Sequence, residues 1–148
     1  MKLNIGCGKV YKEGFVNIDA FDKSVADKIM DADNLDFLND SVDEIYAGQL
    51  IEHLGIIKSI YTLSEWFRVL KPGGILTVET PFIEESFKRF LKGDRETKKV
   101  LINWIYGLDT EGMTHKFCFP EDLLEEVLNR AGFVDFKKTY YDFIDKTG

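Results

Sequence analysis

The sequence predicts an α/β fold with a mostly parallel sheet and helices on both of its faces. Short apolar runs alternate along the chain with stretches whose apolar residues recur at helical spacing. The first apolar run leads directly into the glycine turn Gly6-Cys7-Gly8, and the second ends at Asp19. A strand, a glycine turn, a second strand and an acid in that order are typical of α/β proteins that bind a nucleoside.

Six apolar runs are predicted to form strands because they are short, rich in β-branched or aromatic residues and bounded by turn-forming residues. The predicted strands are Lys2–Ile5, Phe15–Ile18, Lys28–Met30, Glu44–Ala47, Ile75–Glu79 and Val134–Tyr140.

Two helices are predicted from apolar spacing and end signals. Between the fourth and fifth strands, one apolar stripe consists of Ile57, Ile60, Leu63, Phe67 and Leu70. The segment Lys71-Pro72-Gly73-Gly74 is expected to end that helix. A second helix is expected to start after Pro120, with acidic residues in its first turn, and to end at Gly132.

Composition points to one domain over residues 1–148, because the chain has 148 residues of which 45% are hydrophobic. The net charge of −7 argues against nucleic acid as a partner, since phosphate backbones attract basic surfaces. No apolar run approaches the length of a membrane span, and Met1-Lys2-Leu3 leads into a strand rather than a signal peptide. We therefore expect a cytoplasmic protein without a membrane partner.

The cysteines and histidines do not suggest a metal site at the level of sequence. Cys7 and Cys118 are far apart and lack a CxxC partner, and His53 and His115 lack the spacing of metal ligands. We expect Cys7 to be a small turn residue and Cys118 to be a buried apolar one.

The turn and acid predict a nucleoside-cofactor site. Gly6 and Gly8 allow a ligand to lie against the backbone, and Asp19 can accept hydrogen bonds from a ribose diol. A dinucleotide fingerprint needs a third glycine or alanine and an acid about 20 residues further on. Here position 11 is Tyr11 and the acid follows much sooner, so a cofactor without a pyrophosphate fits better.

The ordered motifs resemble those of class I S-adenosylmethionine-dependent methyltransferases, in particular the small "type 11"-like members. The motifs that carry the resemblance are Gly6-Cys7-Gly8, Asn17-Ile18-Asp19, Asp31 to Phe37, Ser41 to Ala47, Leu50-Ile51-Glu52-His53-Leu54 and Arg68 to Gly74. Thr114 to Phe117 and Pro120 to Phe133 resemble the C-terminal part of such enzymes. The resemblance implies a Rossmann-like class I fold and S-adenosyl-L-methionine as cofactor.

The resemblance also implies which residues bind the cofactor. They are Asn4, Gly6, Cys7, Gly8, Asp19, Ala20, Asp31, Ala32, Gln49 and Leu50. Asn4 stands where family members often carry an acid that faces the cofactor's amino group, and Asp33 is an alternative to Asp31 at the adenine, or a cap of the following turn. The segment Lys9 to Gly14 is too short for the family's first helix, and little sequence remains for its last strand. An uncovered sheet edge would favour a homodimer.

His53 and His115 are the candidate catalytic residues, because an imidazole can act as a general base near neutral pH. The alternative is that both histidines are structural. Residues 82–119 could form a lid, and they include the basic residues Lys88, Arg89, Lys92, Arg95, Lys98 and Lys99. These cations are either a solvated face or a means of recruiting an anionic substrate.

The sequence thus predicts methyl transfer to a small-molecule acceptor, such as a sugar derivative or an acidic metabolite. The alternatives are a non-catalytic module or partner subunit that binds S-adenosylmethionine or S-adenosylhomocysteine, and a nicotinamide oxidoreductase. The choice of acceptor depends on loops whose sequence does not reveal it.

Overall fold

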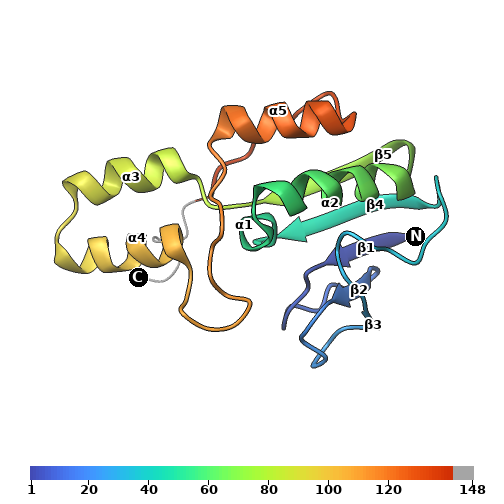
Figure 1. Cartoon of the computed structure of the whole chain (residues 1–148), viewed down its shortest axis with the longest axis horizontal. Coiled ribbons are helices and arrows are strands. Elements are labelled where there is room, and N and C mark those ends of the chain that lie inside the picture. The colour runs from blue at the N-terminus through green and yellow to red at the C-terminus, as the bar shows by residue number, and fades with distance from the viewer. Residues whose placement is uncertain (142–148) are drawn as a thin grey trace.

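A parallel sheet of five strands, in the order β3-β2-β1-β4-β5, forms the centre of the protein (Figure 1). The computed structural model describes residues 1–141. The strands are β1 (Lys2–Ile5), β2 (Val16–Asp19), β3 (Lys28–Ile29), β4 (Val42–Gly48) and β5 (Leu70–Glu79). Every neighbouring pair is parallel, which confirms the predicted α/β class.

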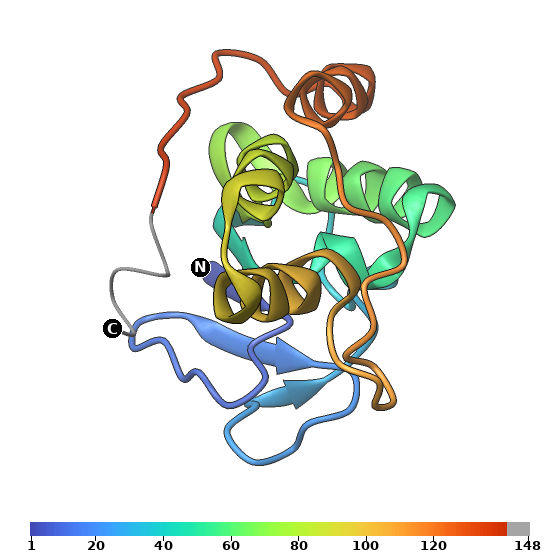
Figure 2. The same cartoon turned by 90° about the vertical axis from the view of Figure 1, so that its left-hand side faces the viewer.

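The helices of the described residues are α1 (Ile51–Leu54), α2 (Ile56–Val69), α3 (Ile83–Lys92), α4 (Arg95–Tyr106) and α5 (Glu121–Ala131). Helix α2 lies along β4 and β5, and α5 packs on α2 (Figure 1). Helices α3 and α4 pack against each other beyond the carboxyl end of β5 (Figures 1 and 2). Between residues 1 and 141, none of the helices has the length and apolar character needed to span a bilayer.

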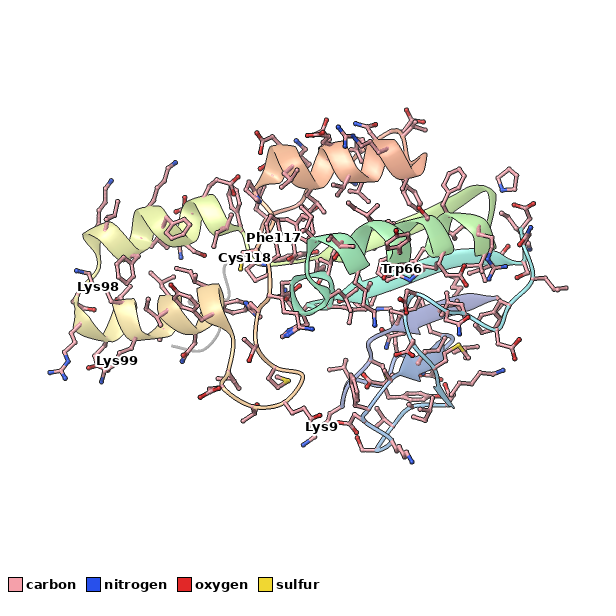
Figure 3. The ribbon with its side chains drawn as sticks, viewed as in Figure 1. Lys9, Trp66, Lys98, Lys99, Phe117 and Cys118 are labelled. Carbon is pink, nitrogen blue, oxygen red and sulfur yellow. The ribbon has the colours of Figure 1, made fainter. Side chains whose placement is uncertain are left out.

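The main core lies between α2 and one face of the sheet. Leu3 pairs with Ile45, which pairs with Leu76, and partners in a parallel sheet point to the same face. Trp66 of α2 fills the space above them and is fully buried (Figure 3). Its indole Nε1 donates to the carbonyl of Ala32 at 2.9 Å, so the core also holds the segment after β3.

The predicted apolar stripe of α2 is wrong in part, because Ile57, Ile60 and Phe67 are exposed. The buried positions of the helix are Ser59, Thr62, Leu63, Trp66 and Val69. Of the two small polar residues, Ser59 donates to the carbonyl of Ile51 at 3.2 Å, whereas the Thr62 hydroxyl has no hydrogen-bond partner within residues 1–141. The buried stripe therefore has helical spacing, but it is centred on Leu63 and Trp66.

The opposite face of the sheet is covered near β1 and β2 by a loop, since no helix connects these strands. This confirms that residues 9–14 are too few for the first helix. Polar residues occupy this face: Asn4 and Asn17 are paired on adjacent strands, and the Lys12 ammonium lies 4.5 Å from the Tyr46 ring centroid. The loop thus covers this part of the sheet through polar contacts, in place of the missing helix.

The predicted sixth strand, Val134–Tyr140, is wrong: these residues form no strand, and β5 has no partner on its outer edge within residues 1–141. Side-chain contacts hold this segment in place, rather than the backbone hydrogen bonds of a strand pair. Lys138 Nζ lies 2.8 Å from Glu121 Oε1, and the Tyr140 hydroxyl donates to Glu121 Oε2 at 2.9 Å. Asp135 also has φ 60°, which interrupts an extended conformation.

The predicted ends of the two helices are confirmed. Helix α2 ends at Val69, before Lys71, although β5 begins at Leu70 rather than at Ile75. The register of β4 and β5 shifts between Val42 and Glu44, which accommodates the Lys71–Gly74 segment within the strand. Helix α5 starts after Pro120 and ends at Gly132, whose φ of 111° is favourable only for glycine.

Candidate functional site

The glycine turn and Asp19 are joined at the carboxyl edge of the sheet. Strands β1 and β2 are paired, and Cys7 N–H continues their ladder by donating to the carbonyl of Ile18 at 3.0 Å. Gly8 N–H then donates to Asp19 Oδ2 at 2.8 Å. Ligands of open α/β sheets bind at this edge, so the turn and the acid are in the expected place for a nucleoside site.

The Asp19 carboxylate organises two loops at once. Its Oδ2 accepts from Gly8 N–H, while Oδ1 accepts from the backbone N–H groups of Phe21 and Asp22 at 2.9 Å and 2.8 Å. An ionised carboxylate can accept about four hydrogen bonds, so Oδ2 retains capacity for a further donor. Asp19 is therefore both a structural residue and an available acceptor.

The two glycines of the turn differ in their surroundings. Both have positive φ, 69° at Gly6 and 51° at Gly8. A Cβ at Gly6 would lie 2.9 Å from two methyl carbons of Leu50, whereas a Cβ at Gly8 would meet nothing within 4 Å. Gly6 thus lies in close contact with the Leu50 side chain, and Gly8 faces open space where a ligand can approach.

This difference predicts unequal effects of alanine at the two positions. We expect Gly8→Ala to lower the free energy of unfolding by about 1 kcal/mol, the cost of positive φ in an L-residue. Gly6→Ala should cost about 1 kcal/mol more, because the new methyl group overlaps Leu50. Urea unfolding of both variants measures the difference. Equal losses would mean that Leu50 moves aside freely and does not select glycine at position 6.

Asn4 supports the loop that replaces the first helix. Its side chain is buried, and its amide donates to the carbonyl of Val10 at 3.1 Å and to Asn17 Oδ1 at 2.8 Å. Asn17 Oδ1 also accepts from Lys12 N–H at 2.8 Å. Both N–H groups of the Asn4 side chain therefore donate hydrogen bonds within the protein, a role that the sequence pattern did not reveal.

The segment after β3 supplies the next predicted residues. Asp31 is exposed and its carbonyl accepts from Asn34 N–H at 3.2 Å in a turn. Ala32 is buried, and its carbonyl accepts from Trp66. Asp33 lies 3.7 Å from Lys58 Nζ, so an ion pair already engages the alternative acid. Asp31 is thus the freer of the two carboxylates.

Gln49 and Leu50 follow β4 at the same edge of the sheet. Gln49 adopts φ 52°, and its N–H donates to the carbonyl of Glu79 at 2.7 Å, which joins the ends of β4 and β5. Ala20, directly after Asp19, is half-buried. Because the strands are parallel, the loops after β1, β2, β3 and β4 thus all lie at the carboxyl edge of the sheet.

Glu52, His53 and His115 form a polar cluster beside this edge. Each offers one ligand atom, and these atoms lie within 4.8 Å of one another. Glu52 is fully buried; its Oε2 accepts from the Thr80 hydroxyl at 3.2 Å, whereas its Oε1 has no hydrogen-bond partner among residues 1–141. The rings of His53 and His115 meet edge to face, with centroids 4.7 Å apart.

Burial shifts the pKa of each member of the cluster toward its neutral form. It raises the pKa of Glu52 to about 7, against a weaker opposing effect of hydrogen bonds that include the one from Thr80. It lowers the pKa of His53, as does the neighbouring His115, and it lowers the pKa of His115 itself. Both imidazoles are therefore neutral at pH 7.

The two cysteines do not form a pair. Cys7 is buried in the glycine turn, as expected, whereas Cys118 is only half-buried and its thiol donates to the carbonyl of Ile105 at 3.1 Å. Burial raises the pKa of both thiols, which keeps them protonated and unreactive.

The loop that carries His115 reaches over the carboxyl edge of the sheet. It descends from α4 toward the loops after β1 and β2 (Figures 1 and 2). A cavity of about 180 Å³ is lined by Phe21 on one side and by Glu111 and Gly112 on the other. Residues of the predicted lid therefore face the loop that Asp19 organises.

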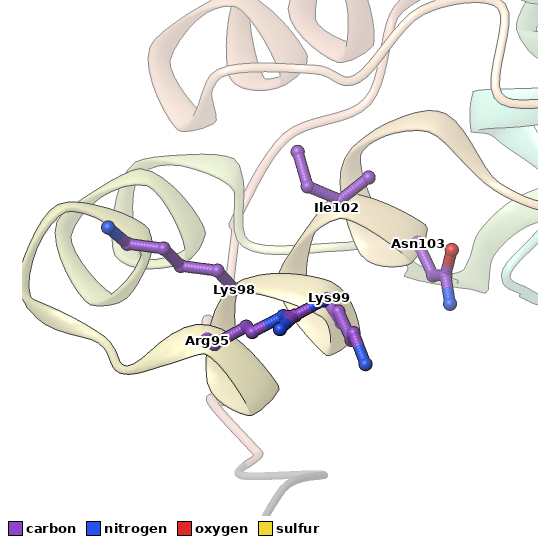
Figure 4. A pocket seen from close by; sticks show the side chains of 5 residues that line it. All are labelled: Arg95, Lys98, Lys99, Ile102 and Asn103. Atoms are coloured by element: carbon purple, nitrogen blue, oxygen red, sulfur yellow. The ribbon is translucent and has the colours of Figure 1, made fainter.

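A larger, basic cavity lies elsewhere, on α4. It has a volume of about 680 Å³ and is lined by Arg95, Lys98, Lys99, Ile102 and Asn103 (Figure 4). Lys98 and Lys99 lie at the far end of the α3–α4 pair from Lys9, the residue after the glycine turn (Figure 3). The volume of a cavity alone thus does not identify the candidate site, because the polar residues of that site lie elsewhere.

Comparison with known proteins agrees with this geometry. The family profile described as "Methyltransferase domain" matches residues 3–138. Sterol 24-C-methyltransferase of Clavispora lusitaniae is 26% identical over 113 residues, which cover 76% of this chain and 28% of that protein. The chain therefore spans less than a third of the length of this curated relative.

Two solved structures share the fold. A S-adenosylmethionine-dependent methyltransferase from Archaeoglobus fulgidus superposes with a TM-score of 0.59 and 19% identity, over 90% of this chain and 61% of that one. A methyltransferase in complex with the Trm112 activator of Haloferax volcanii gives a TM-score of 0.57 and 17% identity, over 88% and 59%.

Proposed function

We propose that this chain, which belongs to the methyltransferase-domain family, binds S-adenosylmethionine at the Gly6–Gly8 turn and transfers the methyl group to a small molecule. The hydrogen bond of 2.8 Å between Gly8 N–H and Asp19 carries the proposal, because it joins the turn to the acid that suits a ribose. The cofactor supplies an activated methyl group, so the protein needs chiefly to bind and orient.

The proposal assigns a part of the cofactor to each loop of the sheet edge. Asp19 and Ala20 hold the ribose, Asp31 and Ala32 meet the adenine, and Gln49 and Leu50 border the sulfonium. Gly6, Cys7 and Gly8 lie under the methionine part. Asn4 can contribute to it only through its side-chain oxygen, since its N–H groups are engaged by Val10 and Asn17. A nicotinamide dinucleotide fits less well, because no helix starts at the turn to receive a pyrophosphate.

His53 and His115 are the proposed catalytic residues on the acceptor side. His53 Nδ1 lies 3.2 Å from the carbonyl of Thr114, and His115 Nδ1 lies 2.8 Å from that of Trp104. A carbonyl can only accept, so each Nδ1 carries the proton and each Nε2 keeps a lone pair. That lone pair can take a proton from a hydroxyl or amine acceptor.

The acceptor is proposed to be a small, anionic or ring-shaped metabolite that residues 82–119 enclose as a lid. Glu111 and Gly112 facing Phe21 support the lid, whereas the cations Arg95, Lys98 and Lys99 line a separate cavity on α4 that lies away from the glycine turn. The enzyme is proposed to be cytoplasmic, and its acidic net charge of −7 argues against nucleic acid as the substrate. The outer edge of β5, which has no partner strand within residues 1–141, supports a homodimer.

The proposed activity is tested by incubating the protein with S-adenosylmethionine labelled in its methyl group and with pools of small metabolites. We expect label in a low-molecular-weight product, at a rate that falls at least about 10-fold in a His53→Ala variant if the imidazole takes the proton. S-adenosylmethionine binding without turnover on any pool would contradict an enzyme.

That outcome would favour a second candidate, a non-catalytic cofactor-binding module or partner subunit. The missing first helix supports this candidate, and so does the structural likeness to a methyltransferase that is bound to an activator. Adding a cell extract that restores turnover would indicate a partner subunit, whereas continued binding alone would indicate a module.

A further inference from the structure

We propose that Glu52, His53 and His115 form a binding site for a divalent transition-metal ion of the Zn²⁺ type beside the glycine turn. The three residues come from α1 and from the loop that follows α4, and their ligand atoms lie within 4.8 Å of one another. Two imidazoles and one carboxylate are a common ligand set of catalytic zinc sites.

The carboxylate of Glu52 is the strongest reason for a cation. Its side chain has no exposed surface, and its Oε1 is buried without a hydrogen-bond partner in the described part of the chain. A buried carboxylate oxygen without a partner is costly, and a positive charge beside it removes that cost. The nearest imidazole nitrogen, His53 Nε2, is 3.9 Å from Oε1, too far for a hydrogen bond.

That separation suits two ligands of one ion. Zinc lies about 2.0–2.2 Å from nitrogen and oxygen ligands, so two tetrahedral ligands are roughly 3.3 Å apart. Glu52 Oε1 and His53 Nε2 are 3.9 Å apart, so an ion would draw them together by less than about 1 Å. Rotation of the half-buried His53 and His115 rings can supply this movement.

The histidines are oriented as metal ligands usually are. In metal sites, the second ring nitrogen commonly donates to a backbone carbonyl or carboxylate, which fixes the ring and leaves the other nitrogen free. Here Thr114 and Trp104 provide carbonyls for the Nδ1 atoms of His53 and His115, at 3.2 Å and 2.8 Å. The Nε2 lone pair of His53, 3.9 Å from Glu52 Oε1, is therefore available to an ion, and His115 offers one further ring nitrogen to the same cluster.

The ligand set also indicates the class of ion. Imidazole favours Zn²⁺, Fe²⁺, Co²⁺ or Ni²⁺, whereas Mg²⁺ and Ca²⁺ prefer sites made only of oxygen. Three protein ligands leave a position for water or substrate, and zinc-bound water loses a proton near neutral pH.

A use in catalysis rests on the proposed function. The acceptor hydroxyl would release its proton to solvent, and its oxygen would form a bond to the methyl carbon while the methyl–sulfur bond breaks. Because the ion would bind a ring nitrogen of each histidine, it would replace the histidines as the means of activating the acceptor.

The experiment is calorimetric titration of tag-free, chelator-treated protein with Zn²⁺ and Mg²⁺, with metal analysis after dialysis. We expect one equivalent of Zn²⁺ to bind and Mg²⁺ not to compete. Glu52→Gln and His115→Ala should each weaken zinc binding by at least about 100-fold, beyond the 10–100-fold typical of losing an outer partner. Cobalt substitution adds a visible spectrum that reports tetrahedral coordination and should be lost in both variants.

Two controls make the result specific. Cys118→Ser removes the nearby thiol, whose Sγ is 3.9 Å from His115 Nδ1, and Glu96→Gln removes an exposed carboxylate of α4. Both should bind zinc like the wild type. The proposal is overturned if the wild type binds less than stoichiometric zinc, or if Glu52→Gln binds it equally well.

A parallel titration with S-adenosylmethionine separates this inference from the proposed function. Cofactor binding without zinc binding would overturn only the metal site. Zinc binding without cofactor binding would overturn only the proposed function. A thermal unfolding temperature close to that of the wild type excludes loss of the fold as the cause of weaker zinc binding in a variant. If Glu52→Gln unfolds, His53→Ala serves as a further ligand variant.

Discussion

Replacing Asp19 by asparagine is expected to weaken S-adenosylmethionine binding by about 100-fold, or about 2.7 kcal/mol. Asp19 accepts from Gly8, Phe21 and Asp22 N–H groups, which requires acceptors on both of its oxygens. Asparagine would turn an N–H₂ group toward one of these donors. The change thus disturbs the turn and also removes the charge that strengthens hydrogen bonds to a ribose, each worth about 1.5–3 kcal/mol.

Calorimetric titration of the wild type and the variant measures this loss. Asp36→Asn is the matched control, because Asp36 is an exposed acid in the segment after β3 and has no role in the proposed site. We expect the control to bind like the wild type. Equal affinity of Asp19→Asn and the wild type would mean that the ribose is not held at the end of β2.

Replacing Trp66 by alanine is expected to lower the free energy of unfolding by about 3–5 kcal/mol. Trp66 is completely buried in the core between α2 and the sheet, and alanine would leave a cavity there. Its hydrogen bond to the carbonyl of Ala32 would also be lost, which leaves a buried acceptor unpaired. Such a loss is a large part of the stability of a domain of this size.

Urea unfolding of Trp66→Ala and Trp66→Phe separates the two contributions. Phenylalanine fills most of the space but cannot donate, so we expect it to cost about 1–3 kcal/mol through the unpaired Ala32 carbonyl. Because Ala32 is a proposed adenine contact, Trp66→Phe should also weaken cofactor binding. A Trp66→Ala variant within 1 kcal/mol of the wild type would contradict a core centred on this residue.

Features that depend on local chemistry were predicted well from the sequence. The Gly6–Gly8 turn has positive φ, which glycine alone adopts readily, and Asp19 ends a strand as its position indicated. Pro120 and Gly132 bound α5 because each has a backbone preference that acts within one turn. These signals require no knowledge of distant parts of the chain.

Features that depend on tertiary packing were predicted less well. Val134–Tyr140 has a strand-like composition, yet Lys138 and Tyr140 bind Glu121 instead of a neighbouring strand. In α2, hydrophobicity favoured Ile57 and Ile60, but the face that packs on the sheet is the one with Leu63 and Trp66. Composition cannot show which of two partly apolar faces of a helix packs against the sheet.

Long-range contacts in the site were beyond the sequence pattern. His53 and His115 have no metal-type spacing, and the loop after α4 alone brings them together. Asn4 and Asn17 form a buried pair that holds residues 9–14. The sequence shows only that Glu52 and His53 are adjacent. The burial of Glu52, which calls for a partner, is visible only in the structure.

The most direct test of the account is a titration of ¹⁵N-labelled protein with S-adenosylhomocysteine, followed by amide NMR spectra. If the cofactor binds at the carboxyl edge of the sheet, the amide signals of Gly6, Gly8, Ala20 and Ala32 shift and saturate together. Signals of Lys98 and Lys99 on α4 should stay unchanged. Shifts confined to α4, or no shifts at a saturating concentration, would contradict a cofactor site at the Gly6–Gly8 turn.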